Sequence, residues 1–260
     1  MEAYTSFAQV YDMFMDDIPY DEWCKYLLEI LHKHNIDSGL MLELGCGTGS
    51  VTRRMADAGF SMIGIDNSED MLSIAREHEE DKGILYLLQD MTEFELYGTV
   101  SAVISICDSI NYITEEEDLL KVFKLVNNYL EQDGVFVFDM NTEYKYREVM
   151  GDNVIAENRE EGSFIWENTY YEDEKINEYD LTLYVKKNSC DEEETYSRFE
   201  ETHYQKAYSV DIVKELIKKA GLEFVAVYDA FTFDEPSETS ERVYFVVKEG
   251  YQEGKAYTNK

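Results

Sequence analysis

Three glycines at alternate positions, Gly45, Gly47 and Gly49, mark the stretch of this sequence that is best suited to hold a ligand. They follow a short apolar run, residues 40–44, and precede a helical apolar pattern that begins at Val51. This order is typical of a strand, a tight turn and a helix. Because glycine tolerates a positive φ and has no Cβ, a ligand can approach the main chain of such a turn closely.

The spacing of these glycines excludes two common phosphate-binding motifs. A P-loop requires a following Gly-Lys-Ser/Thr, which this chain lacks, and the dinucleotide fingerprint requires G-x-G-x-x-G, whereas this chain has G-x-G-x-G. Glu43 lies just before the first glycine. A carboxylate there would repel a pyrophosphate, but it suits a ligand with an amino group or a cation. S-adenosylmethionine carries both, as an ammonium and a sulfonium.

Residues 43–49, with the sequence ELGCGTG, resemble motif I of the class I S-adenosylmethionine-dependent methyltransferases. The resemblance implies an α/β fold with a doubly wound, seven-stranded Rossmann-like sheet and an antiparallel β insertion after strand five. It implies S-adenosylmethionine as the cofactor and S-adenosylhomocysteine as the product. The cofactor site implied by this motif comprises Glu43, Gly45, Cys46, Gly47 and Gly49.

Asp66 ends the next expected strand, residues 60–66. In a doubly wound sheet, an acid at this position lies beside the first turn and can accept hydrogen bonds from ribose hydroxyls. The alternative is that Asp66 is only an acid before the following helix. We assign Asp66 and its neighbour Asn67 to the cofactor site.

The third expected strand, residues 84–88, leads into Gln89, Asp90 and Met91. The resemblance implies that an acid here accepts a hydrogen bond from the adenine amino group, and that its neighbour lies against the ring. Asp90 and Met91 match that pattern, and Gln89 is assigned to the same site. A methionine alone would indicate only core packing.

The fourth expected strand, residues 100–107, is a nearly continuous apolar run, as expected for a strand buried on both faces. The resemblance implies that the segment 107–112 faces the transferred methyl group, and Cys107 is assigned to the cofactor site. This segment is not the Asn/Asp-Pro-Pro-Tyr sequence of enzymes that methylate nucleobase amines. It therefore argues against a nucleic-acid substrate.

Methyl transfer is an in-line displacement, so the protein contributes mainly alignment and proximity. An acceptor that must lose a proton also needs a general base. The candidates are Asp108 and His203. The structural alternatives are a turn residue for Asp108 and a surface strand residue for His203.

An aromatic lead-in precedes the glycine-rich turn. Residues 4–12 resemble the lead-in of small-molecule methyltransferases, in which a tyrosine lies over the sulfonium end, and on that resemblance Tyr11 is a candidate for the methyl-transfer site. The alternative is packing against the sheet edge, which we expect for Trp23. Pro19 is expected to start the second helix.

Local signals predict several element ends. Ser68 and Ser209 are expected to cap helices, and Thr114 with Glu117 has the spacing of a capping box. Strand five is expected at residues 135–138.

The chain is expected to fold in three parts: a helical lead-in (1–39), a cofactor domain (40–145 and 208–250) and a β insertion acting as a substrate lid (146–207). Three antiparallel strands are expected in the insertion, at 164–171, 176–186 and 196–204. Residues 151–207 include 16 acidic and 6 basic residues. The insertion resembles that of glycine N-methyltransferase-like and amino-sugar N-methyltransferases. It carries aromatic residues that suit a small amine, namely Trp166, Tyr170 and Tyr184.

The formal charge of −33, from 56 acids and 23 bases, argues against a nucleic-acid partner and against binding to anionic lipid. We expect no membrane span and no signal peptide. The four cysteines match no metal spacing, so we expect free thiols, no metal and a cytoplasmic protein. The oligomeric state is expected to be a monomer or a homodimer.

The predicted function is methyl transfer from S-adenosylmethionine to a small-molecule acceptor, with an amine nitrogen favoured. Two alternatives stay open: a protein that binds the cofactor without turnover, as a sensor or scaffold, and a methyltransferase of a basic protein. A nicotinamide oxidoreductase is disfavoured by the glycine spacing.

Overall fold

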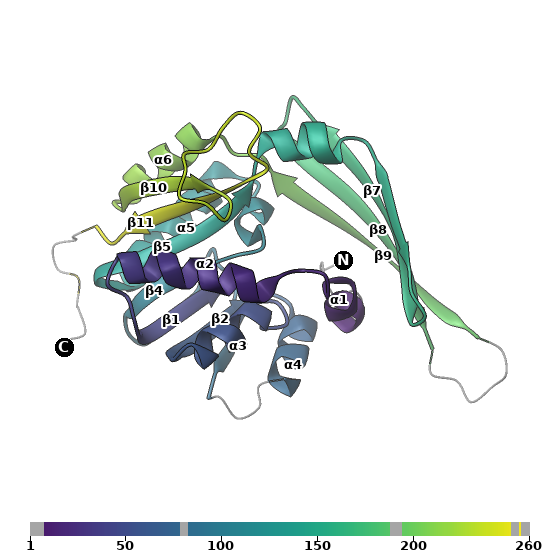
Figure 1. Cartoon of the computed structure of the whole chain (residues 1–260), viewed down its shortest axis with the longest axis horizontal. Coiled ribbons are helices and arrows are strands. Elements are labelled where there is room, and N and C mark those ends of the chain that lie inside the picture. Colours follow the sequence, from purple (N-terminus) through teal and green to yellow (C-terminus); the bar gives the residue numbers. More distant parts are fainter. Residues whose placement is uncertain (1–7, 79–82, 188–193, 251–254, 256–260) are drawn as a thin grey trace.

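The computed structural model describes residues 8–78, 83–187, 194–250 and 255. Two sheets organise the chain (Figure 1). The larger sheet has seven strands in the order β10 (Glu223–Asp229), β11 (Arg242–Lys248), β5 (Leu130–Asn141), β4 (Val100–Ser105), β1 (Gly39–Leu44), β2 (Phe60–Asp66) and β3 (Leu85–Leu88). The five strands from β5 to β3 are parallel, and β10 and β11 form an antiparallel hairpin at one edge. The predicted doubly wound, seven-stranded fold is confirmed.

Helices cover both faces of this sheet. One buried cluster unites it with α2 (Tyr20–Lys33), α3 (Ser50–Asp57) and α4 (Glu69–Glu77). The other unites it with α5 (Glu116–Tyr129) and α6 (Val210–Lys219). β5 shows why both faces are filled: Phe136 and Phe138 join the α5 cluster, whereas Val135 and Val137 join the α2 cluster. Alternate residues of a strand point to opposite faces, so a strand buried on both sides must be apolar throughout.

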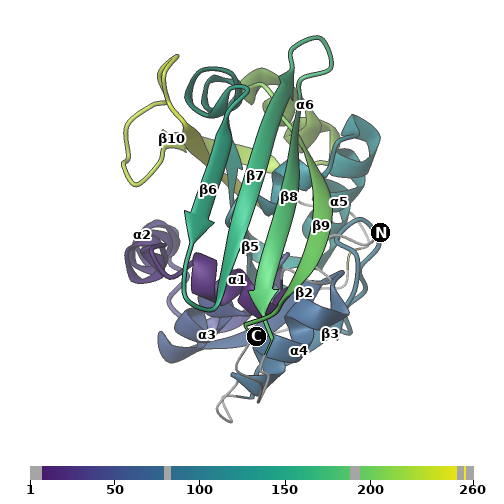
Figure 2. The same cartoon turned by 90° about the vertical axis from the view of Figure 1, so that its right-hand side faces the viewer.

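The smaller sheet is antiparallel, in the order β6 (Val154–Asn158), β7 (Gly162–Tyr171), β8 (Ile176–Lys186) and β9 (Tyr196–Lys206). One of its faces is turned away from the larger sheet (Figures 1 and 2). Leu181 and Leu183 of β8 are buried on the inner face, where Phe14 of α1 (Ala8–Phe14) packs against the sheet. The ring of Phe14 lies edge-on to that of Phe164, with centroids 4.9 Å apart.

Most predicted element ends are confirmed. Ser68 accepts a hydrogen bond from the backbone N–H of Met71, and Ser209 accepts one from that of Ile212. Trp23 is buried, as predicted for a core residue. Cys24, Cys46 and Cys107 are free thiols. Cys190 and residues 4–7 of the lead-in motif lie outside the described residues.

Three local predictions differ from the structure. The capping box is wrong: Glu115, in extended backbone, occupies the N-cap position of α5 without a side-chain cap, and acids in the first turn complement the helix dipole instead. Strand five is longer than predicted, because β11 pairs with it from Val135 to Asn141 and Val100 of β4 pairs with Leu130. β6 was not predicted, because its residues are mostly exposed and do not alternate. Within the described parts of the chain, no helix combines the length and the apolar character that a membrane span needs.

Replacing Ser209 with alanine removes the hydroxyl that caps α6, and we expect the free energy of unfolding to fall by about 1 kcal/mol. Urea denaturation of S209A measures this loss. S73A is the matched control, because Ser73 is exposed and bonds only within its own helix, to the carbonyl of Glu69. Equal losses in the two variants would contradict the capping role.

Candidate active site

A cavity of about 470 Å³ lies at the carboxyl ends of the parallel strands β1, β2 and β4. This volume is in the range of small-ligand sites. The position is the switch point of a doubly wound sheet, where the strand order reverses between β1 and β4. Its walls come from five parts of the chain: α1 with the start of α2, the β1–α3 turn, the end of β2 with α4, the loop after β3, and the loop after β4.

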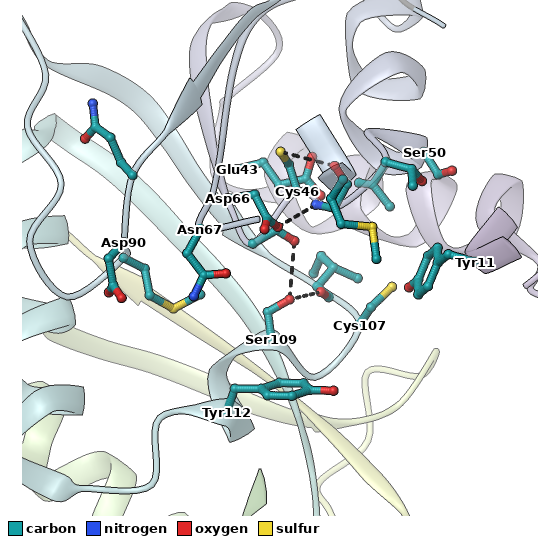
Figure 3. A pocket seen from close by; sticks show the side chains of 18 of the residues that line it. Tyr11, Glu43, Cys46, Ser50, Asp66, Asn67, Asp90, Cys107, Ser109 and Tyr112 are labelled. Atoms are coloured by element: carbon teal, nitrogen blue, oxygen red, sulfur yellow. Dashed lines mark hydrogen bonds between the residues drawn. The ribbon is translucent and has the colours of Figure 1, made fainter. Parts of the chain in front are cut away.

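Eleven of the fourteen predicted site residues line this cavity (Figure 3). They are Tyr11, Glu43, Gly45, Cys46, Gly47, Asp66, Asn67, Gln89, Asp90, Met91 and Cys107. The other three, Gly49, Asp108 and His203, lie outside the lining. Their roles stay predictions.

The glycine turn is built from the main chain. Gly45 donates its N–H to the carbonyl of Ile65 at 2.9 Å, which places the turn against the end of β2. A Cβ on Gly45, whose φ is +69°, would stand 2.7 Å from Oγ of Ser109. Gly47, with φ +52°, has no atom within 4 Å of the position of a Cβ. The backbone of Gly47 therefore borders open space.

Gly49 serves the helix rather than the cavity. It is the N-cap residue of α3, with φ +77°. A Cβ there would collide with the hydroxyl of Tyr86. A glycine is needed at position 49 because of this close approach and because the backbone there is left-handed.

Two carboxylates lie beside the turn. Glu43 is 2% exposed and accepts a hydrogen bond from the hydroxyl of Thr52. Burial raises the pKa of Glu43 to about 8, and the Thr52 hydrogen bond opposes that rise. Asp66 accepts from the backbone N–H of Gly47 at 2.8 Å and of Ser68 at 2.9 Å. Burial also raises the pKa of Asp66, against the lowering effect of these backbone bonds.

The loop after β3 holds two polar residues at the cavity wall. Asp90 accepts hydrogen bonds at one oxygen from the backbone N–H and the hydroxyl of Thr92, at 2.7 and 2.6 Å. Gln89 accepts from the backbone N–H of Glu95 at 2.8 Å. These bonds fix the two side chains at the end of β3.

Aromatic residues enclose the opposite end of the cavity. Tyr11 and Tyr20 line it from the N-terminal helices, and Tyr112 lines it from the 3₁₀ turn η1 (Ser109–Tyr112). Burial raises the pKa of Tyr11 well above its ordinary value, so its phenol stays neutral. α1 is held to the glycine turn, because the hydroxyl of Thr48 donates to Asp12 at 2.6 Å.

The two predicted bases lie just behind this wall. Both carboxylate oxygens of Asp108 are engaged, one with Arg242 and one with Gln205, each at 2.6 Å. His203, 3% exposed, lies with Nδ1 3.5 Å from the hydroxyl of Tyr112. Tyr112 therefore stands between His203 and the cavity.

Nine further lining residues were not predicted as site residues: Tyr20, Thr48, Ser50, Val51, Met71, Ile106, Ser109, Tyr112 and Ile113. Ser109 and Tyr112 belong to the segment 107–112 that the sequence already marked, so their polar side chains could have been chosen. No pattern around Tyr20 in the sequence indicates a site residue, because it reaches the cavity only through the path of α2 across the sheet.

Comparison with known proteins agrees with this geometry. A family model described as "Methyltransferase domain" matches residues 41–134. The chain is 37% identical over 244 residues to "Putative methyltransferase YqeM" of Bacillus subtilis (strain 168), covering 93% of this chain and 95% of that protein. A solved S-adenosylmethionine-dependent methyltransferase from Clostridium acetobutylicum ATCC 824 superposes with a TM-score of 0.83 at 28% identity, over 96% of this chain and all of that one.

This chain belongs to the S-adenosylmethionine-dependent methyltransferases. A further relative of this methyltransferase is the dTDP-3-amino-3,6-dideoxy-alpha-D-glucopyranose N,N-dimethyltransferase of Streptomyces fradiae. The two are 29% identical over 113 residues, which is 44% of each protein.

The cavity of the methyltransferase fits S-adenosylmethionine. Gly47 leaves open space against its main chain, so a ligand can reach the backbone. The side-chain oxygens of Glu43, Asp66 and Asp90 offer hydrogen-bond acceptors to a cavity of about 470 Å³. Such a set of acceptors is complementary to a ligand with an ammonium, a sulfonium and ribose hydroxyls.

Replacing Gly47 with alanine puts a methyl group into this open space. We expect the affinity for S-adenosylhomocysteine, measured by titration calorimetry, to fall about tenfold or more, because overpacking costs about 1–3 kcal/mol. G83A is the matched control: Gly83 is also left-handed, with φ +71°, has no atom within 4 Å of the Cβ position and lies outside the cavity lining. Undiminished affinity in G47A would show that the ligand does not contact this turn.

Replacing Glu43 with glutamine tests the pKa of the buried acid. With a folded-state pKa of about 8, Glu43 keeps its proton while the unfolded chain releases it, so the free energy of unfolding falls as pH rises from about 5 to 8. Glutamine does not ionise, so E43Q should gain stability relative to wild type across this interval, by up to about 4 kcal/mol. Urea denaturation between pH 5 and 9 without cofactor measures the difference. Parallel curves would contradict the raised pKa.

Proposed function

We propose that this methyltransferase acts on a small-molecule acceptor and that the favoured methylated atom is an amine nitrogen. The observation that carries this proposal is the polar aromatic cluster where the smaller sheet meets the cofactor cavity. The hydroxyl of Tyr112, a cavity residue, lies 3.1 Å from the hydroxyl of Tyr179 on β8 and 3.5 Å from Nδ1 of His203 on β9. The insertion therefore places polar side chains directly behind Tyr112, at the wall of the cavity.

The cluster is suited to handle a proton. The side chain of Glu201 approaches Nε2 of His203 at 3.4 Å, and both residues are buried. A carboxylate beside one imidazole nitrogen fixes the orientation of the ring and leaves the other nitrogen, Nδ1, facing Tyr112. When bound, S-adenosylmethionine supplies an electrophilic methyl group. In the proposed reaction, Tyr112 orients the acceptor and takes up the proton that a protonated amine must release, while its own hydroxyl proton passes to Nδ1 of His203.

Aromatic packing holds this base in place. The imidazole of His203 stacks on the ring of Tyr179, with centroids 5.4 Å apart and an angle of 28° between the planes. Trp166 in turn packs against Tyr179, with the two ring centroids 4.6 Å apart. The ring of Tyr112 lies edge-on to that of His203, so the same packing fixes the residue that lines the cavity. A fixed orientation of the acceptor is the main requirement of the displacement.

The electrostatics favour a cationic acceptor. The chain carries a formal charge of −33, and the acids Asp66 and Asp90 line the cavity. Such a field raises the local concentration of cations and repels polyanions. The Streptomyces fradiae relative is named for methylation of an amino sugar nucleotide at nitrogen, which supports the same class of acceptor. We further propose a cytoplasmic protein, a monomer or homodimer, divided at the boundaries predicted from the sequence with residues 146–207 as the substrate lid.

Incubation with methyl-labelled S-adenosylmethionine and defined acceptor panels tests the proposal. The panels are amino sugars and small amines, small carboxylates and phenols, RNA, and a basic protein. We expect label in the amine panel. Label confined to another panel would overturn the proposed acceptor. Tight binding of S-adenosylhomocysteine with no label in any panel or in a cell extract would favour the sensor or scaffold.

His203→Gln removes the proposed base behind Tyr112. For an amine acceptor found in this way, we expect kcat to fall by about 100-fold, the lower range for general-base catalysis, while the affinity for S-adenosylhomocysteine is retained. The control is Tyr204→Phe, because Tyr204 is the next residue of β9 and is 48% exposed. An unchanged kcat in H203Q would remove His203 from the reaction.

A further inference from the structure

The carboxylate of Asp108 lies at the junction of the two sheets. One oxygen, Oδ1, accepts from Nη2 of Arg242 on β11, and the other, Oδ2, accepts from Nε2 of Gln205 on β9, both at 2.6 Å. Arg242 belongs to the seven-stranded sheet and Gln205 to the insertion sheet. One side chain therefore joins the two sheets.

A buried ion pair holds Asp108 from behind. Nη1 of Arg242 donates to Asp139 of β5, which is fully buried. Asp139 also accepts from the backbone N–H of Asp108 at 2.8 Å and of Cys107 at 3.3 Å. The guanidinium of Arg242 lies 5.3 Å from the ring centre of Trp23 on α2. Buried charges cost desolvation energy, so this cluster is better explained by the geometry it fixes than by stability.

The geometry that it fixes is a strained turn at the cavity wall. Cys107 and Asp108 both adopt left-handed backbone conformations, with φ of +63° and +52°, which non-glycine residues seldom adopt. The two backbone N–H groups of this turn are those bonded to Asp139. The turn then presents Cys107, Ser109 and Tyr112 to the cavity.

The partner of Asp108 on the insertion sheet is equally fixed. Gln205 is 1% exposed, and its Oε1 accepts from the hydroxyl of Tyr146 at 2.7 Å. The next residue of β9, Lys206, accepts through its carbonyl from the side chain of Asn111 at 2.8 Å. Gln205 and His203 are both buried and two positions apart on β9, so they share its inner face.

We propose that the Asp108–Gln205 hydrogen bond, backed by Arg242 and Asp139, is the joint that fixes the insertion sheet over the methyl-transfer site. Asp108 is then a positioning residue and not the general base. This joint determines the conformation of the turn at the cofactor cavity. It also determines the position of the β9 side chains that lie against the segment 107–112.

Exchanging the two partners tests this joint. In D108N the new amide has one oxygen for two donors, Gln205 and Arg242, so its NH2 group must face one of them. In Q205E two carboxylates meet. In the double variant D108N/Q205E the new amide donates to the new carboxylate, which can still accept from Tyr146, while the remaining oxygen at position 108 still accepts from Arg242. The total charge of the double variant equals that of wild type.

Two measurements follow each variant. Titration calorimetry gives the affinity for S-adenosylhomocysteine, and acrylamide quenching of Trp166, in a W23F background, reports the seating of the insertion sheet. We expect each single change to weaken binding about tenfold and to increase quenching, and the double variant to return within about threefold of wild type, since contacting residues couple strongly. Thr202→Val is the matched control, because it removes a 2.6 Å hydrogen bond to Asp180 on the exposed face of the same strands.

Three results would overturn the proposal: wild-type affinity and quenching in both single variants, a double variant with the summed loss of the two, or a T202V variant as impaired as D108N. Neither measurement uses a methyl acceptor, so the outcome is separate from that of the proposed substrate class.

Discussion

Parallel strands buried between two layers of helices end at a common edge, and the active site depends on this constraint. The interiors of β1, β2 and β4 must be apolar because helices cover both faces. Apart from Ser61 and Ser101 near the strand starts, the polar residues of these strands lie towards their carboxyl ends. The register pairs Glu43 with Gly64 on one side and with Ile104 on the other. Glu43, Asp66 and Cys107 consequently meet around one cavity although they are far apart in the sequence.

Several acids at or behind the site are buried or half-buried, and buried polar groups need hydrogen-bond partners. Backbone N–H groups supply much of the compensation: Asp66 accepts from Gly47 and Ser68, and Asp139 accepts from Asp108. Glu43, with only the Thr52 hydroxyl as a donor in the described structure, has a pKa of about 8. A cation bound beside Glu43 would favour its ionised form, and a sulfonium cofactor with an ammonium group carries such a charge.

Sequence reasoning succeeded where a signal is local and failed where it is not. The glycine spacing, the acids at strand ends and the capping serines are each visible within a few residues, and they located most of the cavity. Arg242 lies 134 positions from Asp108, and no pattern in either segment indicates that they pair. β6 lacks alternation because it is exposed, and Thr114 has the right spacing for a cap but lies one residue before the N-cap position of α5. Long-range pairing and the exact start of a helix depend on tertiary packing, which a single sequence does not display.

The short helix α1 touches both functional regions. Asp12 accepts from Thr48 of the glycine turn, while Asp16, just beyond the helix, pairs with Arg159 of the insertion at 2.7 and 2.9 Å. Seven residues are too few for a helix to be stable alone in water. Its stability therefore depends on its contacts with the glycine turn and the insertion. By linkage, a ligand bound in the cavity also stabilises the helix. Release of the product nucleoside therefore lowers the stability of α1, by the same coupling free energy with which an ordered α1 favours binding.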